Sequence, residues 1–307
     1  MTQYIFRRLL QMIPITLGIL TLIFSLIHFI PGDPAVQIAG EGARPEDVQS
    51  VRTALGLDKP LWQQYVNYLT NLLQGDLGTS FRTNESVSKE IAARYPATMQ
   101  LAFAAMIVAI IVALPLGVVS AIYRNSWIDN LARFFALVGV SMPSFALAPL
   151  LIIAFALNNE WFPVSGREAG WKSIVLPAIT MGLALSAILT RMVRVSLAEE
   201  LNQLYFKTAI AKGVSTMRAI FAHAMKNAMI PVITILALQF GSLLTGAIIT
   251  EQIFSWPGLG RLLVQSINTR DYPQVQASIL VIAVTYMLVN FISDLLYAVV
   301  DPRIKLE

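Results

Sequence analysis

The sequence contains no cysteine and only two histidines. Without cysteine there can be no disulfide, no thiolate metal site and no cysteine nucleophile. The histidines, His28 and His223, lie far apart in the chain, which is a weak basis for a metal site. Charged residues make up 13% and hydrophobic residues 56% of the chain, whereas a soluble domain carries about 25% charged residues. This deficit of charge indicates a membrane protein.

The sequence also lacks a nucleotide-binding loop of the G-x-x-x-x-G-K-[ST] type. The glycine-rich stretches "GDLGTS" and "WPGLG" are turns and not phosphate cradles. The chain therefore cannot hydrolyse ATP by itself, and the ATPase of any ATP-driven process must be a separate subunit. The net charge of +4 comes without a basic patch interleaved with aromatic residues, so we expect no nucleic-acid partner.

Long apolar runs, in contrast, are abundant. A helix needs roughly 20 apolar residues to cross a bilayer. Arg7 and Arg8 precede the first run, but that run is longer than a signal core and no small-residue cleavage pattern follows it, so we expect a retained membrane helix. The sequence thus predicts an all-α, polytopic membrane protein with six transmembrane helices, at about 9–30, 97–122, 131–157, 174–194, 229–251 and 277–300.

The distribution of Lys and Arg predicts how the chain crosses the membrane. With six spans both termini share one side, and that side has the larger excess of basic over acidic residues. The positive-inside rule therefore places both termini and the 195–228 loop in the cytoplasm. The long segment 31–96 is then external.

This external segment is expected to form a small helical lobe. "RPEDVQSVRTALG" has proline and acids at a helix start and glycine at its end. "KPLWQQYVNYLTNLLQG" has apolar residues on one face of a second helix. The predicted organisation is an N-terminus with the first membrane helix (1–30), an external helical segment (31–96) and a transmembrane domain with helices two to six (97–307).

The cytoplasmic loop combines basic residues with a helical pattern. Gly213 interrupts that pattern and suits a left-handed C-terminal cap, and Ser215 suits the N-cap of a following helix. We therefore expect a helix–glycine–helix elbow. Its second helix is predicted to present one apolar face, made of Met217, Ile220, Phe221, Ala224, Met225, Ala228 and Met229.

Two interpretations of this elbow compete on physical grounds. In the first, it lies at the membrane surface, with its basic residues on anionic headgroups and its apolar face on the bundle. In the second, it enters a cleft on a cytoplasmic partner and transmits the motion of that partner. The pattern by itself slightly favours the first interpretation.

Motifs along the whole chain alter that preference. "KTAIAKG" followed by "HAMKNAMIP" resembles the EAA loop of ABC-importer permeases, in the form found in the dipeptide/oligopeptide/nickel branch. Five other regions also resemble that branch, in the same order: "FRRLLQMIP" with "HFIPGDPA", "LGLDKPLWQQYVNYLTNLLQGDLGTSF", "VGVSMPSFALAPLL", "TEQIFSWPGLGRLLVQSINTRDYPQVQA" and "DLLYAVVDPRI". Their order along the chain makes the resemblance highly specific.

The resemblance implies that the elbow is a coupling helix that inserts into a groove of an ATP-binding subunit. Lys207, Thr208 and Ala209 stand where the motif has E-A-A, so a lysine replaces its acidic residue, and Gly213 is the glycine of the motif. The coupling residues implied by position are Lys207, Thr208, Ala209, Ile210, Ala211, Lys212, Gly213, Val214, Ser215 and Arg218.

The same resemblance implies the surroundings of the chain. Its expected partners are a second homologous permease subunit, two cytoplasmic ATP-binding subunits, an extracytoplasmic substrate-binding protein and the lipid bilayer. ATP and Mg would be bound by the ATPase subunits, and this chain would hold no cofactor, no metal and no catalytic residue. The expected location is the cytoplasmic (inner) membrane of a bacterium or archaeon.

Polar residues within or beside the predicted spans are candidates for a translocation path. The alternative for each is a hydrogen bond between helices; for Glu251, at an outer span end, the alternatives are contact with solvent or a cap of the "SWPGLG" turn. The candidates for the path or a gate are Ser141, Met142, Ser144, Gln239, Thr245 and Glu251.

Other classes of function fit the sequence less well. A stand-alone secondary transporter or channel would need ionisable residues in the middle of its spans, which are nearly free of them. A membrane hydrolase would need a nucleophile with a base, or a metal cluster. The expected function is therefore import of di- or oligopeptides as one permease subunit of an ATP-driven importer, with nickel, glutathione or another small polar solute as the alternative substrate.

Overall fold

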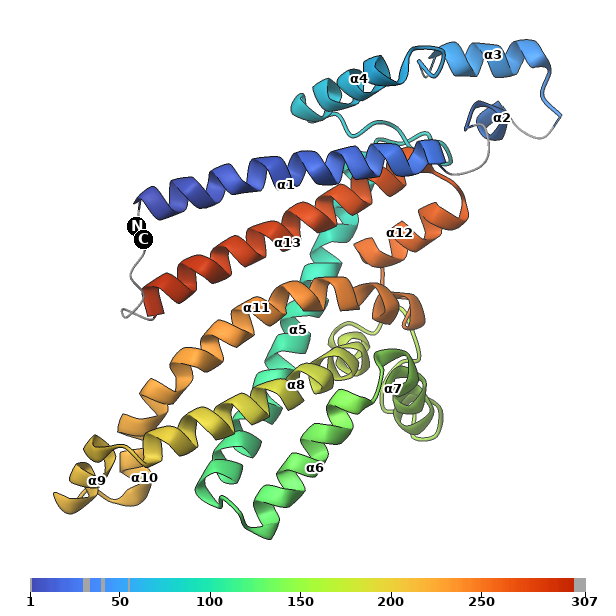
Figure 1. The fold of residues 1–307 in the computed structure, drawn as a ribbon. Coiled ribbons are helices and arrows are strands. Elements are labelled where there is room, and N and C mark those ends of the chain that lie inside the picture. The colour runs from blue at the N-terminus through green and yellow to red at the C-terminus, as the bar shows by residue number, and fades with distance from the viewer. Residues whose placement is uncertain (1, 30–33, 40–41, 55, 301–307) are drawn as a thin grey trace. The chain divides into compact units, whose positions relative to one another are not determined.

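The computed structural model describes residues 2–29, 34–39, 42–54 and 56–300. Helices dominate this part of the chain (Figure 1), and its only β-pairing is an isolated bridge between Thr79 and Ser86. The "PGDP" stretch, apart from its final Pro34, and the C-terminal "DPRI" lie outside the described residues.

The chain divides into two compact units, which are described separately. We call residues 1–5, 95–261 and 285–307 the core unit, and residues 6–94 and 262–284 the lobe unit. Three long helices and one short helix pass from one unit into the other along the chain.

The lobe unit contains both helices that were predicted for the external segment. They are α3 (Pro45–Ala54) and α4 (Leu61–Leu73). Two acidic residues, Glu46 and Asp47, lie in the first turn of α3, where they interact favourably with the helix dipole. Most of α1 (Thr2–Phe29), α2 (Pro34–Ala39), the start of α5 (Val87–Ile122), the end of α12 (Leu259–Asn268) and the start of α13 (Tyr272–Val300) complete the unit.

The core unit is built around α8 (Trp171–Leu201), which packs against α11 (Met225–Ile253), α6 (Trp127–Ser141) and α7 (Ser144–Leu151). A π-helical segment, η1 (Ile152–Leu157), extends α7. Between α8 and α11 lie α9 (Leu204–Ala211), α10 (Thr216–Ala219) and a second π-helical segment, η2 (Ile220–Ala224).

Small residues bring α5 close to α8. Apolar residues at every fourth position of α5 are buried in the core, and one helical face carries this repeat. A side chain at Gly182 of α8 would place its Cβ 2.6 Å from the carbonyl oxygen of Ala105. This approach requires glycine, as is common between membrane helices. The α5 stripe consists of Ala97, Leu101, Ala105, Ala109 and Ala113.

Among the residues that the structure describes, five helical segments are long and apolar enough to cross a membrane: Ile5–Ser25, Val87–Ile122, Trp171–Leu201, Thr216–Ile253 and Tyr272–Leu296. They correspond to five of the six predicted spans. Thr216–Ile253 extends well before the predicted start at 229, because α10, η2 and α11 follow one another without interruption.

The remaining predicted span, 131–157, is not one continuous helix. Its two halves, Trp127–Gly139 and Ser144–Leu157, meet at an angle of 101°. Pro143 causes the break, because proline lacks an amide hydrogen and disfavours the helical conformation in the residue before it. Met142 is accordingly extended, with φ −92° and ψ 111°. The pair raises the number of candidate spans to six if it is counted as one.

Candidate coupling elbow and pore residues

The elbow consists of α9, the turn at 212–215, α10 and η2, and it connects the two central helices of the core unit. Gly213 has a φ of +85°, as expected for a left-handed cap. The amide of Gly213 donates to the carbonyl of Ile210 at 2.9 Å, and the amide of Val214 donates to that of Ala209 at 3.2 Å. These two bonds form a Schellman motif, so the cap predicted at Gly213 is confirmed.

Three apolar side chains fix the elbow to the core. Phe206 is buried, and Ala209 and Val214 pack against the same buried cluster. Ser215 occupies the N-cap position of α10, as predicted, with extended φ and ψ. Its side chain makes no capping hydrogen bond. The elbow is therefore positioned by packing and by the Schellman turn.

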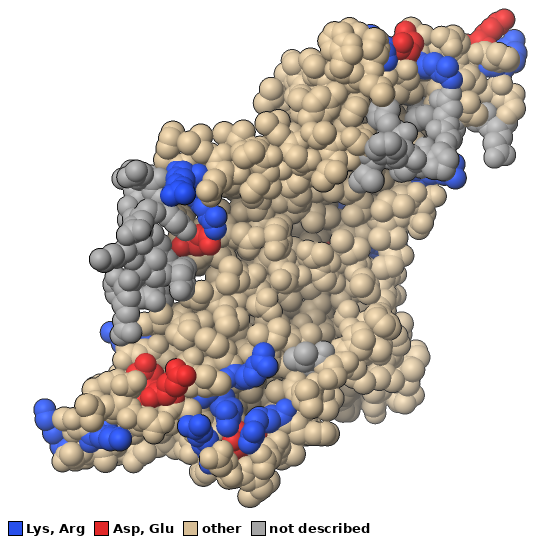
Figure 2. Space-filling view, in the orientation of Figure 1, with Lys and Arg blue, Asp and Glu red and all other residues tan. Residues whose placement is uncertain are grey.

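The tip of the elbow is exposed. Of the ten residues implied by the resemblance, Ala209 and Val214 are half-buried and the other eight are exposed. Their exposed surface includes Lys207, Lys212 and Arg218. Figure 2 shows Lys and Arg gathered over this end of the core unit, whereas the visible surface of its middle is nearly free of charge.

The predicted apolar face of the second elbow helix is only partly buried. Ile220, Ala224 and Ala228 are buried, but Met217 and Phe221 are each 60% exposed. The prediction assumed a regular α-helix, whereas η2 adds an extra residue to the turn and changes which side chains face the core. With Leu204, which is 79% exposed, Met217 and Phe221 give the elbow an apolar surface that the described part of the chain does not cover.

A hydrogen-bond chain ties the elbow to both neighbouring helices. The Tyr205 hydroxyl donates to Glu200 Oε2 near the end of α8, and Asn227 Nδ2 of α11 donates to the Tyr205 oxygen at 3.2 Å. Partial burial and the bond to Glu200 raise the pKa of Tyr205. The hydroxyl therefore stays protonated at physiological pH and keeps the bond to Glu200.

The candidate path residues occupy different environments. Ser141 and Ser144 flank the break at Pro143, and Ser141 is exposed. Gln239 is half-buried and Thr245 is exposed on α11. Within the described residues, no hydrogen bond or ion pair joins any two of Ser141, Ser144, Gln239 and Thr245.

Glu251 differs from the other candidates because its side chain is 0% exposed. Its Oε1 accepts from Thr98 Oγ1 at 2.6 Å, and its Oε2 accepts from the amide of Arg261 at 3.0 Å. The Thr98 hydroxyl in turn accepts from the amide of Leu259 at 2.8 Å. These contacts favour the capping role for Glu251, at the first turn of α12.

Sequence reasoning missed a buried ionic cluster that joins α5, α6 and α8. Asp129 is 0% exposed and accepts from Arg194 Nε at 2.7 Å and from Arg194 Nη2 at 2.8 Å. Ser120 Oγ donates to Asp129 at 2.5 Å, and Arg133 lies 3.2 Å from it. The i,i+4 spacing of Asp129 and Arg133 was visible in the sequence, but nothing in it indicated the partner 65 residues away.

Comparison with family profiles covers nearly the whole chain. Residues 113–306 match the profile described as "Binding-protein-dependent transport system inner membrane component". Residues 1–102 match the profile of the N-terminal part of the same type of membrane component.

Individual relatives agree with these profiles. The glutathione transport system permease proteins GsiC of Escherichia coli O6:H1 and Salmonella typhimurium are each 43% identical over 305 residues, covering 99% of both chains. Among solved structures, an inward-facing MetNI methionine ABC transporter matches with a TM-score of 0.58 and 17% identity, over 69% of this chain and 96% of that chain. An amino acid ABC transporter matches with a TM-score of 0.51 and 15% identity, over 68% and 94%. These structures show a shared fold.

Proposed function

Because this chain belongs to the family of binding-protein-dependent transport system inner membrane components, we propose that it couples ATP hydrolysis to solute import through the elbow. The chain is a multi-pass permease subunit of an ABC importer in the inner membrane, and it is not itself an enzyme. A component of this kind implies an ATPase and a binding protein as partners.

The observation that carries this proposal is the exposed apolar surface of the elbow. Leu204, Met217 and Phe221 remain uncovered although Phe206 and Val214 anchor the same segment to the core. An apolar surface rimmed by basic side chains suits a protein groove, because burial of apolar area supplies affinity and charge supplies orientation. Because the sequence lacks a phosphate-binding loop, ATP hydrolysis must be passed to this chain by contact with a separate ATPase. The ATPase is therefore the partner that we assign to this surface.

The position of the elbow supports a mechanical role. It joins α8 to α11, and these two helices pack against each other in the core unit. The Tyr205 hydrogen bonds connect the elbow to both of them. A displacement of the elbow by the ATPase would therefore act on both helices together, as alternating access requires.

We also propose the finer arrangement. The elbow and both termini lie in the cytoplasm, α3 and α4 belong to an external lobe, and the bent pair of α6 with α7 and η1 completes six spans. A second homologous permease subunit encloses the path, with Ser141, Met142, Ser144, Gln239 and Thr245 as its candidate lining residues. Two ATPase subunits drive the transport cycle.

The proposed substrates are short peptides. This proposal is supported by the GsiC relatives, whose names assign them to glutathione transport, since glutathione is itself a tripeptide. Within the described residues, no group of three His, Cys, Asp or Glu side chains is placed to hold a metal ion. That finding offers no support for nickel as the substrate.

Reconstitution tests the proposal. The chain is co-expressed with the permease, ATPase and binding-protein genes of its own transport system, and the complex is placed in liposomes with a labelled tripeptide. We expect the subunits to co-purify and uptake to require both ATP and the binding protein. Uptake by this polypeptide alone would contradict the proposal, and stimulation of ATP hydrolysis only by a metal chelate would contradict the peptide substrate.

A further inference from the structure

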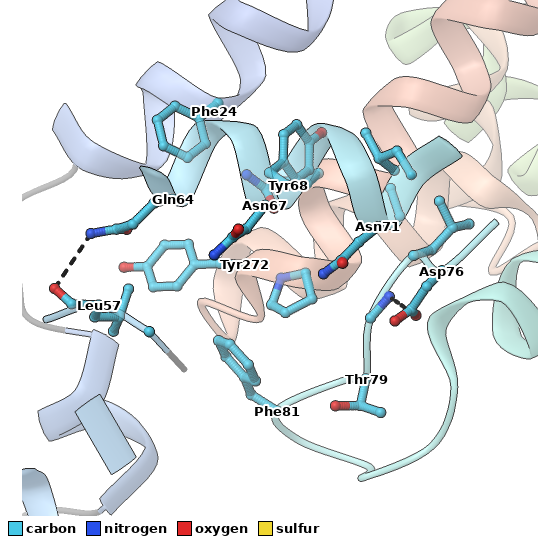
Figure 3. Close-up of a pocket in the computed structure, with 17 residues that line it drawn as sticks. Phe24, Leu57, Gln64, Asn67, Tyr68, Asn71, Asp76, Thr79, Phe81 and Tyr272 are labelled. Carbon is cyan, nitrogen blue, oxygen red and sulfur yellow. Dashed lines mark hydrogen bonds between the residues drawn. The ribbon is translucent and has the colours of Figure 1, made fainter. Parts of the chain in front are cut away.

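The lobe unit contains a pocket of about 320 Å³ between α4, the 76–81 loop and the start of α13, which is large enough for a small ligand. Its inner wall is apolar and aromatic, with Phe24, Leu72 and Phe81 (Figure 3). Most of its polar side chains are amides and phenols, and Thr79 and Asp76 add a hydroxyl and a carboxylate; the amides and phenols belong to Gln64, Asn67, Tyr68, Asn71, Tyr272 and Gln276.

Two buried hydroxyls beside this pocket have no hydrogen-bond partner in the described part of the chain. They belong to Tyr68 and Tyr272, and the Tyr272 side chain is only 5% exposed. A buried hydroxyl without a partner is unfavourable, because it has lost its bonds to water. Figure 3 shows the Tyr272 hydroxyl directed toward the side of the pocket where Gln64 and Leu57 lie. A polar ligand atom at this wall would supply the missing bond.

The amide groups lie in a row along α4. Gln64, Asn67 and Asn71 are three and four residues apart, so they share one face of the helix. Gln64 Nε2 donates to the carbonyls of Lys59, at 2.8 Å, and of Leu57, at 3.4 Å. The side chains of Asn67 and Asn71, in contrast, make no hydrogen bond within the described residues and can accept and donate toward a peptide backbone.

The pocket has a single charged residue, Asp76, at the end away from Leu57 in Figure 3. Asp76 Oδ1 accepts from the amide of Gly78 at 2.8 Å, which orients the carboxylate. Its other oxygen has no hydrogen bond within the described residues. A carboxylate without any cation in the lining selects for a positively charged group.

We propose that this pocket binds the amino-terminal end of a short peptide on the external lobe. Asp76 holds the terminal ammonium, the amides of Asn67 and Asn71 bond the first peptide units, and the aromatic wall packs against a side chain. This inference rests on the proposed function for the external position of the lobe and for the choice of peptides. It adds a peptide site within this chain itself, separate from the binding protein.

Peptide binding to the complete transporter in lipid nanodiscs, without the binding protein, tests this inference. We use Ala-Phe, N-acetyl-Ala-Phe and Ala-Phe amide. Because Asp76 is at an exposed rim, where solvent screens charge, acetylation should weaken binding roughly three- to tenfold, whereas amidation should leave it unchanged. Higher salt should reduce the difference between the free and the acetylated peptide.

Two variants and a control locate the effect. Asp76→Asn should bind free and acetylated peptides equally, and Tyr272→Phe should weaken both to the same extent. Asp58→Asn removes another exposed carboxylate of the lobe unit that does not line the pocket, and it should behave as wild type. ATP-driven uptake with saturating binding protein is measured in parallel, so that loss of import in the wild type is recognised as a failure of the proposed function.

Equal binding of free and acetylated peptide to the wild type would overturn the inference, as would the absence of binding. A third contrary result is that Asp76→Asn changes only the affinity for the unliganded binding protein. The pocket would then be part of a docking surface for that protein.

Discussion

Substitution of Arg194 by methionine should strongly destabilise the core unit. The Arg194 guanidinium makes two bonds to Asp129, at 2.7 and 2.8 Å, and Asp129 has no exposure to solvent. Methionine keeps most of the length of the side chain but removes the charge and both donors. The variant therefore leaves a buried carboxylate without its main partner.

The structure sets the size of this effect. Removal of one partner of a buried ion pair costs about 3–5 kcal/mol. Ser120 and the amide of Asn125 still donate to Asp129, and Arg133 remains 3.2 Å away. Because these contacts partly compensate the charge, we expect the lower end of that range, about 3 kcal/mol.

Equilibrium unfolding by SDS in mixed micelles measures the free energy of unfolding. The matched control is Arg191→Met, one turn earlier on the same helix, where the arginine is exposed and makes no ion pair within the described residues. It should change stability by less than about 0.5 kcal/mol.

A double substitution distinguishes the cost of an unpaired buried carboxylate from the cost of losing the arginine side chain itself. Asp129→Leu together with Arg194→Met replaces the pair by apolar side chains, and the double variant should recover to within about 1 kcal/mol of wild type. If Arg194→Met is no less stable than Arg191→Met, or if the double variant is no more stable than the single one, the reasoning about this buried cluster is wrong.

Three further predictions concern other parts of the chain. Glu251→Gln removes the negative charge and leaves one oxygen to accept from both Thr98 and the amide of Arg261, so it should lower the free energy of unfolding by roughly 1–3 kcal/mol; unchanged stability would contradict the capping role. Gly213→Ala and Gly166→Ala both place a side chain at positive φ in open space, at φ +85° and +82°, and each should cost roughly 1–2 kcal/mol. Only Gly213→Ala should also reduce transport-coupled ATP hydrolysis, and an equal reduction in both would remove the elbow from the coupling path. Burial and the neighbouring Tyr65 raise the pKa of Tyr68 from 10.0 to about 12, so its contribution to the stability of the lobe is complete below pH 10 and decreases as the pH rises toward 12. Absorbance of tyrosinate should show a late-titrating tyrosine that is absent from Tyr68→Phe.

Local patterns carried much of the fold. The apolar runs predicted six spans, five of which are continuous long helices, and Pro45 with two following acids marked the start of α3. Gly213 predicted the helix cap because glycine adopts a positive φ without strain. Each of these features depends on residues that are close together in the sequence, so the sequence was enough to predict it.

Features that depend on distant neighbours were not found. The hydrogen bonds between Asp129 and Arg194 join α6 to α8. Nothing in the local sequence of either helix marks these two residues as partners. The π-helical segment η2 exposed Met217 and Phe221, which a regular helical repeat had assigned to the buried face. The lobe pocket brings α4 together with the start of α13, about 200 residues later in the chain.

The coupling residues could be predicted from the sequence only in part. A resemblance of motifs placed them at 207–218, and neither the pattern of charges nor the periodicity could decide between a lipid surface and a protein partner. The structure separates residues that anchor the elbow, such as Ala209 and Val214, from residues that are available to a partner, such as Ile210 and Lys212.

Contact between the elbow and the ATPase is the most direct test of the coupling role. The natural chain has no cysteine, so Ile210→Cys provides a single thiol in this subunit, which can be labelled with a benzophenone maleimide before assembly with its partners. Val164→Cys, at an exposed apolar position outside the elbow, is the control. Illumination should cross-link the subunit to the ATPase from position 210 and not from position 164. If position 210 cross-links only to lipid while ATP-driven uptake is intact, the elbow is not the coupling site.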